Sequence, residues 1–154
     1  MANLIRRMQG PTGRVTEVTF IDGNFVGFRI TEANGSLVDD LHFREGTWKS
    51  AGGSRMAQGA TIDDDGNISI VETDGNRTAH LACGEEVLTR YDRDGLPTES
   101  LALRDGKETA RFDYELREGR FSAYARFPGI PEPIPVKPED TVIVSRLRAA
   151  GLTI

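Results

Sequence analysis

The sequence contains one cysteine, two histidines and no long apolar run. The single Cys83 excludes an internal disulfide, and so few thiols and imidazoles exclude a zinc-type ligand framework. No segment approaches the roughly 20 apolar residues of a membrane-spanning helix. The 19 basic and 24 acidic residues give a net charge of −5. The chain therefore lacks the excess of positive charge that is typical of nucleic-acid-binding proteins. No apolar signal region occurs near the start of the sequence, so we expect a cytoplasmic protein. From the preceding observations we expect no cofactor, no metal, no nucleic-acid partner and no membrane span.

Dipeptides that end in glycine occur at short intervals along the chain. An aspartate, asparagine or glutamate before glycine tolerates the positive φ angles of tight hairpin turns. The runs between these pairs are rich in Val, Ile, Thr, Phe and Tyr, which is typical of consecutive antiparallel strands. We therefore predict an all-β, up-and-down meander of about ten strands. The pairs are Asp22-Gly23, Asn34-Gly35, Glu45-Gly46, Asp65-Gly66, Asp74-Gly75, Asp94-Gly95, Asp105-Gly106 and Glu118-Gly119.

The strand register can be predicted if each turn contains two residues. Residues opposite each other across a hairpin share one face of the sheet. The predicted inner face is apolar, and its members include Ile68, Ile70, Ala79, Leu81, Leu88, Leu101, Leu103, Ala110, Phe112 and Tyr114. The predicted outer face is polar and includes Ser69, Thr78, His80, Thr89 and Ser100. No helical pattern is long enough to cover such a sheet, so we expect it to close, or nearly close, into a barrel of calycin-like architecture.

The chain is expected to hold one barrel domain at 14–127, preceded by an N-terminal arm at 1–13 and followed by an arm at 128–154. Five of the seven prolines fall in 128–138, which predicts a stiff, extended stretch. Beyond it, Glu139 to Ala150 fits either a short helix or a strand. Its apolar side chains are candidates for binding a partner: Ile143, Leu147 and Ile154.

The same predicted register gathers charged and aromatic residues at one end of the inner face. Arg90 and Glu99 stand directly opposite each other, and the neighbouring positions are Arg77, Asp92, Phe112 and Tyr114. A polar mouth above an apolar floor is typical of a small-ligand site. There Arg90 and Tyr114 would polarise a carbonyl, while Glu99 or Asp92 would move a proton. The alternative is that these residues are solvated pairs at strand ends.

Three other motifs are weaker indications of function. Thr61 to Glu72, TIDDDGNISIVE, overlays a calcium-loop pattern, but it lacks the first carboxylate and flanking helices, so a tight turn is favoured and no metal is expected. His42 and His80 are predicted to lie on the surface. Gly46-Thr47-Trp48 is similar to the G-x-W signature of lipocalin-like barrels. In that class the signature opens the first strand, whereas three predicted strands precede it here, so we assign no family.

Two hypotheses for function remain. The first is a non-enzymatic β-barrel protein that associates through its terminal arms, with itself as a homo-oligomer or with a larger complex as a structural or accessory subunit. The second is a small lipocalin-like barrel that binds an apolar small molecule, and that cyclises or isomerises it if it is an enzyme. The sequence does not decide whether the protein is an enzyme, and it favours the first hypothesis narrowly.

Overall fold

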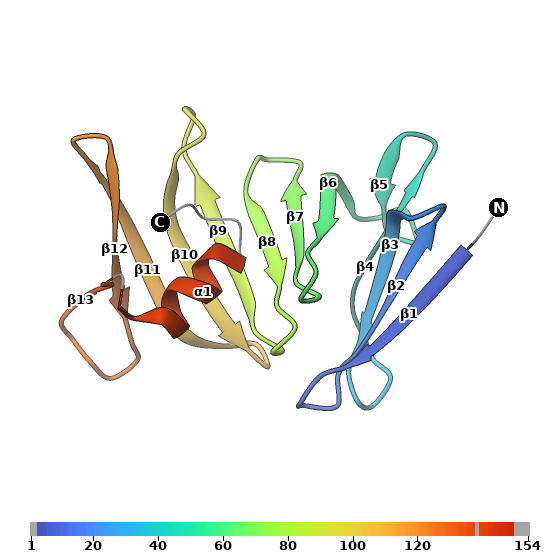
Figure 1. The fold of residues 1–154 in the computed structure, drawn as a ribbon, viewed down its shortest axis with the longest axis horizontal. Helices are drawn as coiled ribbons and strands as arrows, with labels where there is room; N and C mark the ends of the chain where they lie inside the picture. The colour runs from blue at the N-terminus through green and yellow to red at the C-terminus, as the bar shows by residue number, and fades with distance from the viewer. Residues whose placement is uncertain (1–2, 138, 150–154) are drawn as a thin grey trace.

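The structure is a computed structural model, and it describes residues 3–137 and 139–149. Thirteen strands follow one another in a single antiparallel sheet whose spatial order is the order of the chain (Figure 1). The elements are β1 (Asn3–Gln9), β2 (Val15–Ile21), β3 (Asn24–Thr31), β4 (Leu37–Arg44), β5 (Thr47–Lys49), β6 (Met56–Ile62), β7 (Ile68–Glu72), β8 (Arg77–His80), β9 (Glu86–Tyr91), β10 (Pro97–Arg104), β11 (Lys107–Arg117), β12 (Arg120–Arg126), β13 (Ile134–Pro135) and α1 (Thr141–Ala149).

The predicted antiparallel meander is confirmed, but the sheet is not closed. Among the described residues β1 pairs only with β2, and β13 pairs only with β12, so the expected barrel and its calycin-like architecture are not confirmed. β1 was not expected from the sequence, because residues 1–13 were predicted to form an arm. The open choice for 139–150 is decided in favour of a helix, α1. In the described part of the chain, no helix has the length and apolar character needed to cross a bilayer.

Three of the turns that define this predicted register contain three residues and not two. The backbone of Glu72 pairs with Asn76, that of Leu81 with Glu85 and that of Asp92 with Leu96, so the loops are 73–75, 82–84 and 93–95. In such loops only the glycine has a positive φ, whereas both residues of a two-residue turn do, as at Asp105-Gly106. The change of loop length places His80 opposite Ile68, on the face that was predicted to be apolar.

A bulge moves the register again between β10 and β11. The two-residue turn at Asp105-Gly106 is confirmed, but the pairing shifts by one position between Ala102 and Leu103. Ser100 therefore lies opposite Phe112 on the outer face, and it is fully buried although we expected this face to be polar and exposed. The predicted pairing of Phe112 with Ala125 across the last long hairpin is confirmed.

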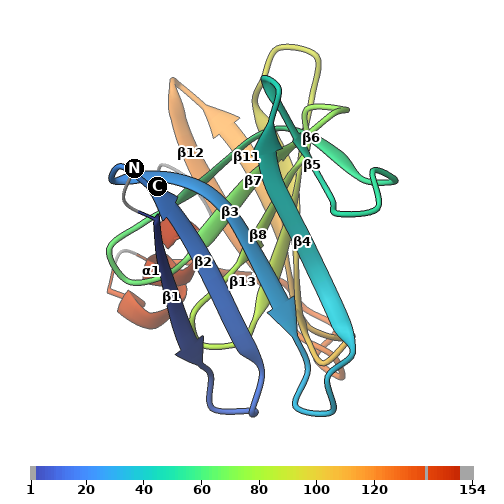
Figure 2. The same ribbon diagram turned by 90° about the vertical axis from the view of Figure 1, so that its right-hand side faces the viewer.

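The apolar core changes from one face of the sheet to the other along the chain. In the first half the sheet curls over a core that includes Val18, Phe28, Leu41 and Ile70, on the face that we name the inner face. Figure 2 shows β1 to β4 as the wall of this curl. In the second half the buried side chains lie on the opposite, outer face, with Ala102, Ala110, Phe112, Ala123 and Ala125.

Helix α1 covers the outer face of the second half. Figure 1 shows α1 in front of β10. Leu147 is 1% exposed and Val144 is 6% exposed, and Leu147 packs with the alanines of β10 to β12. Each half of the sheet therefore buries its own apolar face, one by curling and the other under a helix. This explains why the sheet does not need to close: closure was predicted from a single apolar face with nothing to cover it.

Candidate functional site

The predicted polar mouth is only partly assembled. Arg90 and Glu99 do lie opposite each other, with 3.7 Å between Arg90 Nε and Glu99 Oε1. The side chain of Arg90 is 73% exposed, so this pair is solvated and contributes little to stability. Asp92 accepts hydrogen bonds from the backbone of Asp94 and Leu96, and it thereby holds the loop between β9 and β10.

The other members of the predicted mouth point to the opposite face. Phe112 and Tyr114 belong to the core beneath α1, where the Tyr114 hydroxyl donates to Ser100 Oγ at 2.7 Å. The guanidinium of Arg77 lies 5.4 Å from the ring centroid of Tyr91. The loops at 73–75 and 82–84 and the bulge explain this separation, because each shifts the register by an odd number of residues and so exchanges the faces of the next strand.

The predicted partner-binding residues have different surroundings. Leu147 is buried against this chain's own sheet, and Ile143 packs beside it. Ile154 lies outside the described residues. Leu147 is thus a core residue, and association through it stays a prediction without an exposed surface to support it.

The inner face holds a buried ionic network that the sequence analysis missed. His80 Nε2 lies 2.8 Å from Asp39 Oδ2, and both side chains are more than nine-tenths buried. Arg55, from the loop between β5 and β6, donates to Asp39 at 2.8 Å and to Glu72 at 2.6 Å. The network joins β4, β7 and β8 across the interior of the curl.

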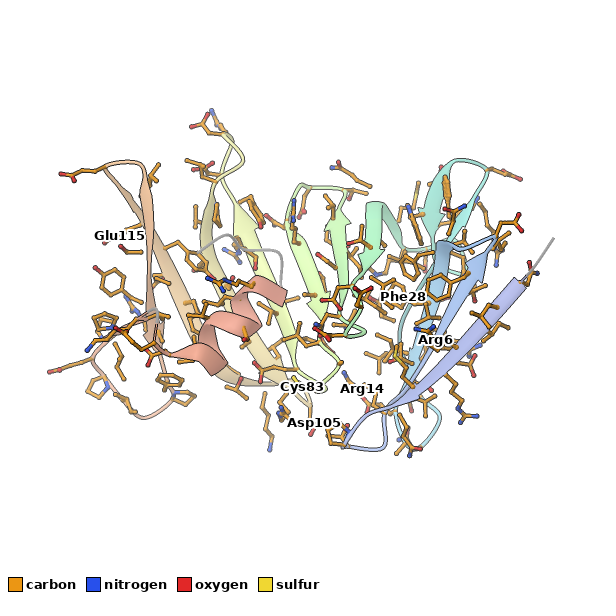
Figure 3. All side chains as sticks on the ribbon, in the orientation of Figure 1. Arg6, Arg14, Phe28, Cys83, Asp105 and Glu115 are labelled. Atoms are coloured by element: carbon orange, nitrogen blue, oxygen red, sulfur yellow. The ribbon has the colours of Figure 1, made fainter. Side chains whose placement is uncertain are left out.

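A second arginine extends the network toward the lower end of the sheet in Figure 3. Arg14, at the start of β2, donates to Glu32 at 2.7 Å and to Glu86 at 3.1 Å. Glu86 Oε1 also lies 4.0 Å from His80 Nδ1. Figure 3 places Arg14 at the same end as Cys83 and Asp105, which belong to loops much later in the chain.

The electrostatics assign the protonation of this network. Burial alone would raise the pKa of Asp39, but hydrogen bonds from His80 and Arg55 outweigh it, and the pKa of Asp39 lies below its ordinary value. Burial would likewise lower the pKa of Arg14, but Glu32 and Glu86 raise it overall. Asp39 is therefore a carboxylate, and it accepts a hydrogen bond from His80 Nε2. The other ring nitrogen, Nδ1, is a hydrogen-bond acceptor in the tautomer that carries its hydrogen on Nε2.

A cavity of about 150 Å³ lies beside this network. Its wall comes from β1, the loop after β1, β2, β3, β7, and the end of β8 with the loop that follows. It contains Met8, Arg14, Thr16, Ile30, Ile68, His80, Leu81 and Ala82. Among the described residues, two buried nitrogen atoms of this wall have no hydrogen-bond partner: Arg14 Nε and His80 Nδ1. Two polar nitrogen atoms thus stand beside an otherwise largely apolar cavity, which is the usual composition of a small-ligand site.

Two other loops carry a readable signal of their length, whereas the loop at 73–75, which moves His80, follows a glutamate and lacks this signal. Asp63 accepts hydrogen bonds from the backbone of Asp65 and Asn67, and Asp92 holds its loop in the same way. An aspartate two positions before an aspartate–glycine pair therefore indicates a three-residue loop here. The calcium-loop pattern at 61–72 corresponds to this turn. No group of three or more potential metal ligands occurs in residues 3–137 and 139–149.

The comparisons with known proteins add no relative. No protein-family profile matches the chain, and no curated protein or solved structure is significantly similar to it. The geometry of the cavity therefore carries the functional argument.

Proposed function

We propose that this protein binds a small, largely apolar molecule in the cavity beside Arg14 and His80. The observation that carries the proposal is the pair of buried, unpartnered nitrogen atoms, Arg14 Nε and His80 Nδ1, on one cavity wall. Buried polar groups in folded proteins are almost always hydrogen-bonded, so two together on one cavity need an external partner. This keeps the small-molecule hypothesis but moves its site from Arg90 and Glu99 to the curled first half of the sheet.

The size of the cavity limits the ligand. A cavity of about 150 Å³ accommodates a molecule of roughly benzene size. The side chains of Met8, Ile30, Ile68 and Leu81 provide apolar contacts for its body. A hydroxyl group suits the polar wall, because its oxygen can accept from Arg14 Nε while its hydrogen is donated to His80 Nδ1.

The surrounding charges favour a neutral ligand over an acid. Arg14 already contacts the carboxylates of Glu32 and Glu86, and His80 lies between those of Glu86 and Asp39. The three carboxylates around this guanidinium and this imidazole repel a further anion. We therefore expect a phenol or a small alcohol to bind better than a carboxylate of the same size.

Calorimetric titration with phenol, toluene and benzoate tests the proposal. Phenol is expected to bind at least about tenfold more tightly than toluene, since toluene leaves both nitrogen atoms unpaired, and more tightly than benzoate. Arg14→Lys keeps the charge beside Glu32 and Glu86 but removes Nε, so it should abolish the preference for phenol. Arg44→Lys, on the exposed end of β4, is the matched control.

Two results would overturn the proposal. One is equal binding of phenol and toluene by the wild type, which would describe an apolar void without a polar site. The other is a preference for phenol that survives in Arg14→Lys while the melting temperature shows that the variant is folded. Failure of all three probes to bind would indicate that solvent alone occupies the cavity.

A further inference from the structure

The open edge of the sheet at β1 is a second feature that the cavity does not explain. β1 pairs with β2 over all of Asn3–Gln9, and no described strand pairs with its other side. The opposite edge, β13, has two residues, and one of them is Pro135. Proline lacks the backbone N–H of a sheet ladder, so β13 is a poor template for another strand. β1 contains no proline or glycine and is the edge that can accept one.

Apolar side chains are exposed on both faces of β1. Leu4 is 54% exposed and Ile5 is 65% exposed. The next residue, Arg6, lies over the ring of Phe20 at 5.8 Å, and Figure 3 shows it on this edge strand. An added strand would bring its own apolar side chains next to Leu4 and Ile5.

A ladder of alternating charges ends at this edge. On the outer face Arg7 lies opposite Glu17, Glu17 lies opposite Arg29, and Arg29 lies opposite Asp40. Opposite charges directly across neighbouring strands stabilise a sheet, whereas like charges destabilise it. The sequence of signs across β4, β3, β2 and β1 is therefore negative, positive, negative and positive. The next strand in this ladder should carry an acidic side chain.

We propose that β1 binds an extended segment of a partner protein that carries an acidic residue opposite Arg7 and apolar residues beside Leu4 and Ile5. This is strand addition, in which the backbone provides the affinity and the side chains provide the specificity. A second copy of β1 fits less well, because each copy would bring Arg6 and Arg7 to the junction. The site is distinct from the cavity, so either proposal can fail without the other.

Fluorescence anisotropy with two labelled seven-residue peptides tests this proposal. One peptide has glutamate at its central position and valine elsewhere, and the other has lysine at that position. Wild-type protein is expected to prefer the glutamate peptide, and Arg7→Glu should change the ratio of the two affinities by about tenfold in favour of the lysine peptide. Arg7→Gln, which does not place two acidic residues opposite each other, should abolish the preference without reversing it.

Arg44→Glu is the control, because Arg44 is an exposed arginine in the interior of the same sheet. It should leave the preference for the glutamate peptide unchanged. Equal affinity of the wild type for both peptides, or an equal effect of Arg44→Glu and Arg7→Glu, would overturn the proposal. A wild-type dimer that protects the amide hydrogens of β1 from exchange would also overturn it, since a second copy would then occupy the edge.

Discussion

His80 Nε2 lies 2.8 Å from Asp39 Oδ2, although 41 positions separate the two residues in the chain. The contact joins β8 to β4 across the interior of the curled sheet. It fixes the imidazole with Nδ1 available to the cavity and with Asp39 ionised. The proposed function and the stability of the first half of the sheet both depend on this pair.

Asp39→Asn should destabilise the protein by about 2–3 kcal/mol, because the change leaves Arg55 and His80 without their shared carboxylate. Urea denaturation followed by circular dichroism measures the loss. Asp64→Asn, on the exposed loop between β6 and β7, removes the same charge and should change stability by less than about 0.5 kcal/mol. Equal effects of the two substitutions would mean that the buried network contributes nothing specific.

The stabilisation provided by Asp39 should also depend on pH. The pKa of Asp39 is lower in the folded protein than its ordinary value of 3.8. The folded state therefore binds this proton less tightly than the unfolded state, so the stabilisation is complete above that ordinary value and is lost as the pH falls through the folded pKa. Unfolding measured from pH 5 downward should show a shallower loss of stability in Asp39→Asn than in the wild type. Parallel pH profiles would contradict this.

Ser100→Ala should cost about 1–3 kcal/mol although it removes a single oxygen atom. Ser100 is fully buried, and its Oγ lies 2.7 Å from both Thr89 Oγ1 and the Tyr114 hydroxyl. The alanine variant leaves the other two hydroxyl groups without that partner. Thermal unfolding provides the measurement, and Ser122→Ala, on the exposed surface of β12, is the control that should have almost no effect.

Leu147→Ala tests whether α1 is part of the fold. Leu147 is 1% exposed above the alanines of β10 to β12, so the truncation should cost about 2–4 kcal/mol. Ser145→Ala, on the exposed side of the same helix, should be nearly neutral. Hydrogen exchange should show faster exchange in β10 to β12 of the Leu147 variant. An unchanged melting temperature would mean that α1 does not cover this face in solution.

Gly27→Ala should be destabilising by about 1–3 kcal/mol because of a single contact. A Cβ atom at this position would collide with Nδ1 of His42 on the neighbouring strand. The double variant with His42→Ala should recover most of the loss, whereas Gly52→Ala, which meets no atom within 4 Å, should have little effect. A double variant as unstable as Gly27→Ala alone would show that the His42 ring is not the obstacle.

The meander itself was predictable from the sequence, but its register was not. Turn residues and β-branched runs fix the order of the strands, whereas the face of each residue depends on whether a loop has two residues or three. His80 shows the consequence, since a three-residue loop at 73–75 moves it from the expected surface into the network. The predicted pairing of Arg90 with Glu99 is correct because the bulge near Pro97 restores the register that a two-residue turn would give.

The cavity could not be predicted because its wall joins segments that are far apart in the chain. Met8 and Thr16 lie in the first two strands, while Ile68 and His80 lie in β7 and β8. Strand pairing brings only consecutive strands together in this sheet, so nothing in a local pattern indicates how far the sheet curls. The curl depends on packing of the whole inner core.

Side-chain ¹⁵N NMR of the protein titrated with phenol tests the central claim most directly. Our account predicts that free His80 carries its hydrogen on Nε2, and that phenol shifts the resonances of His80 Nδ1 and Arg14 Nε together while those of Arg44 and Arg90 stay in place. A hydrogen on Nδ1 in the free protein, or resonances of Arg14 and His80 that do not respond at saturating phenol, would contradict it.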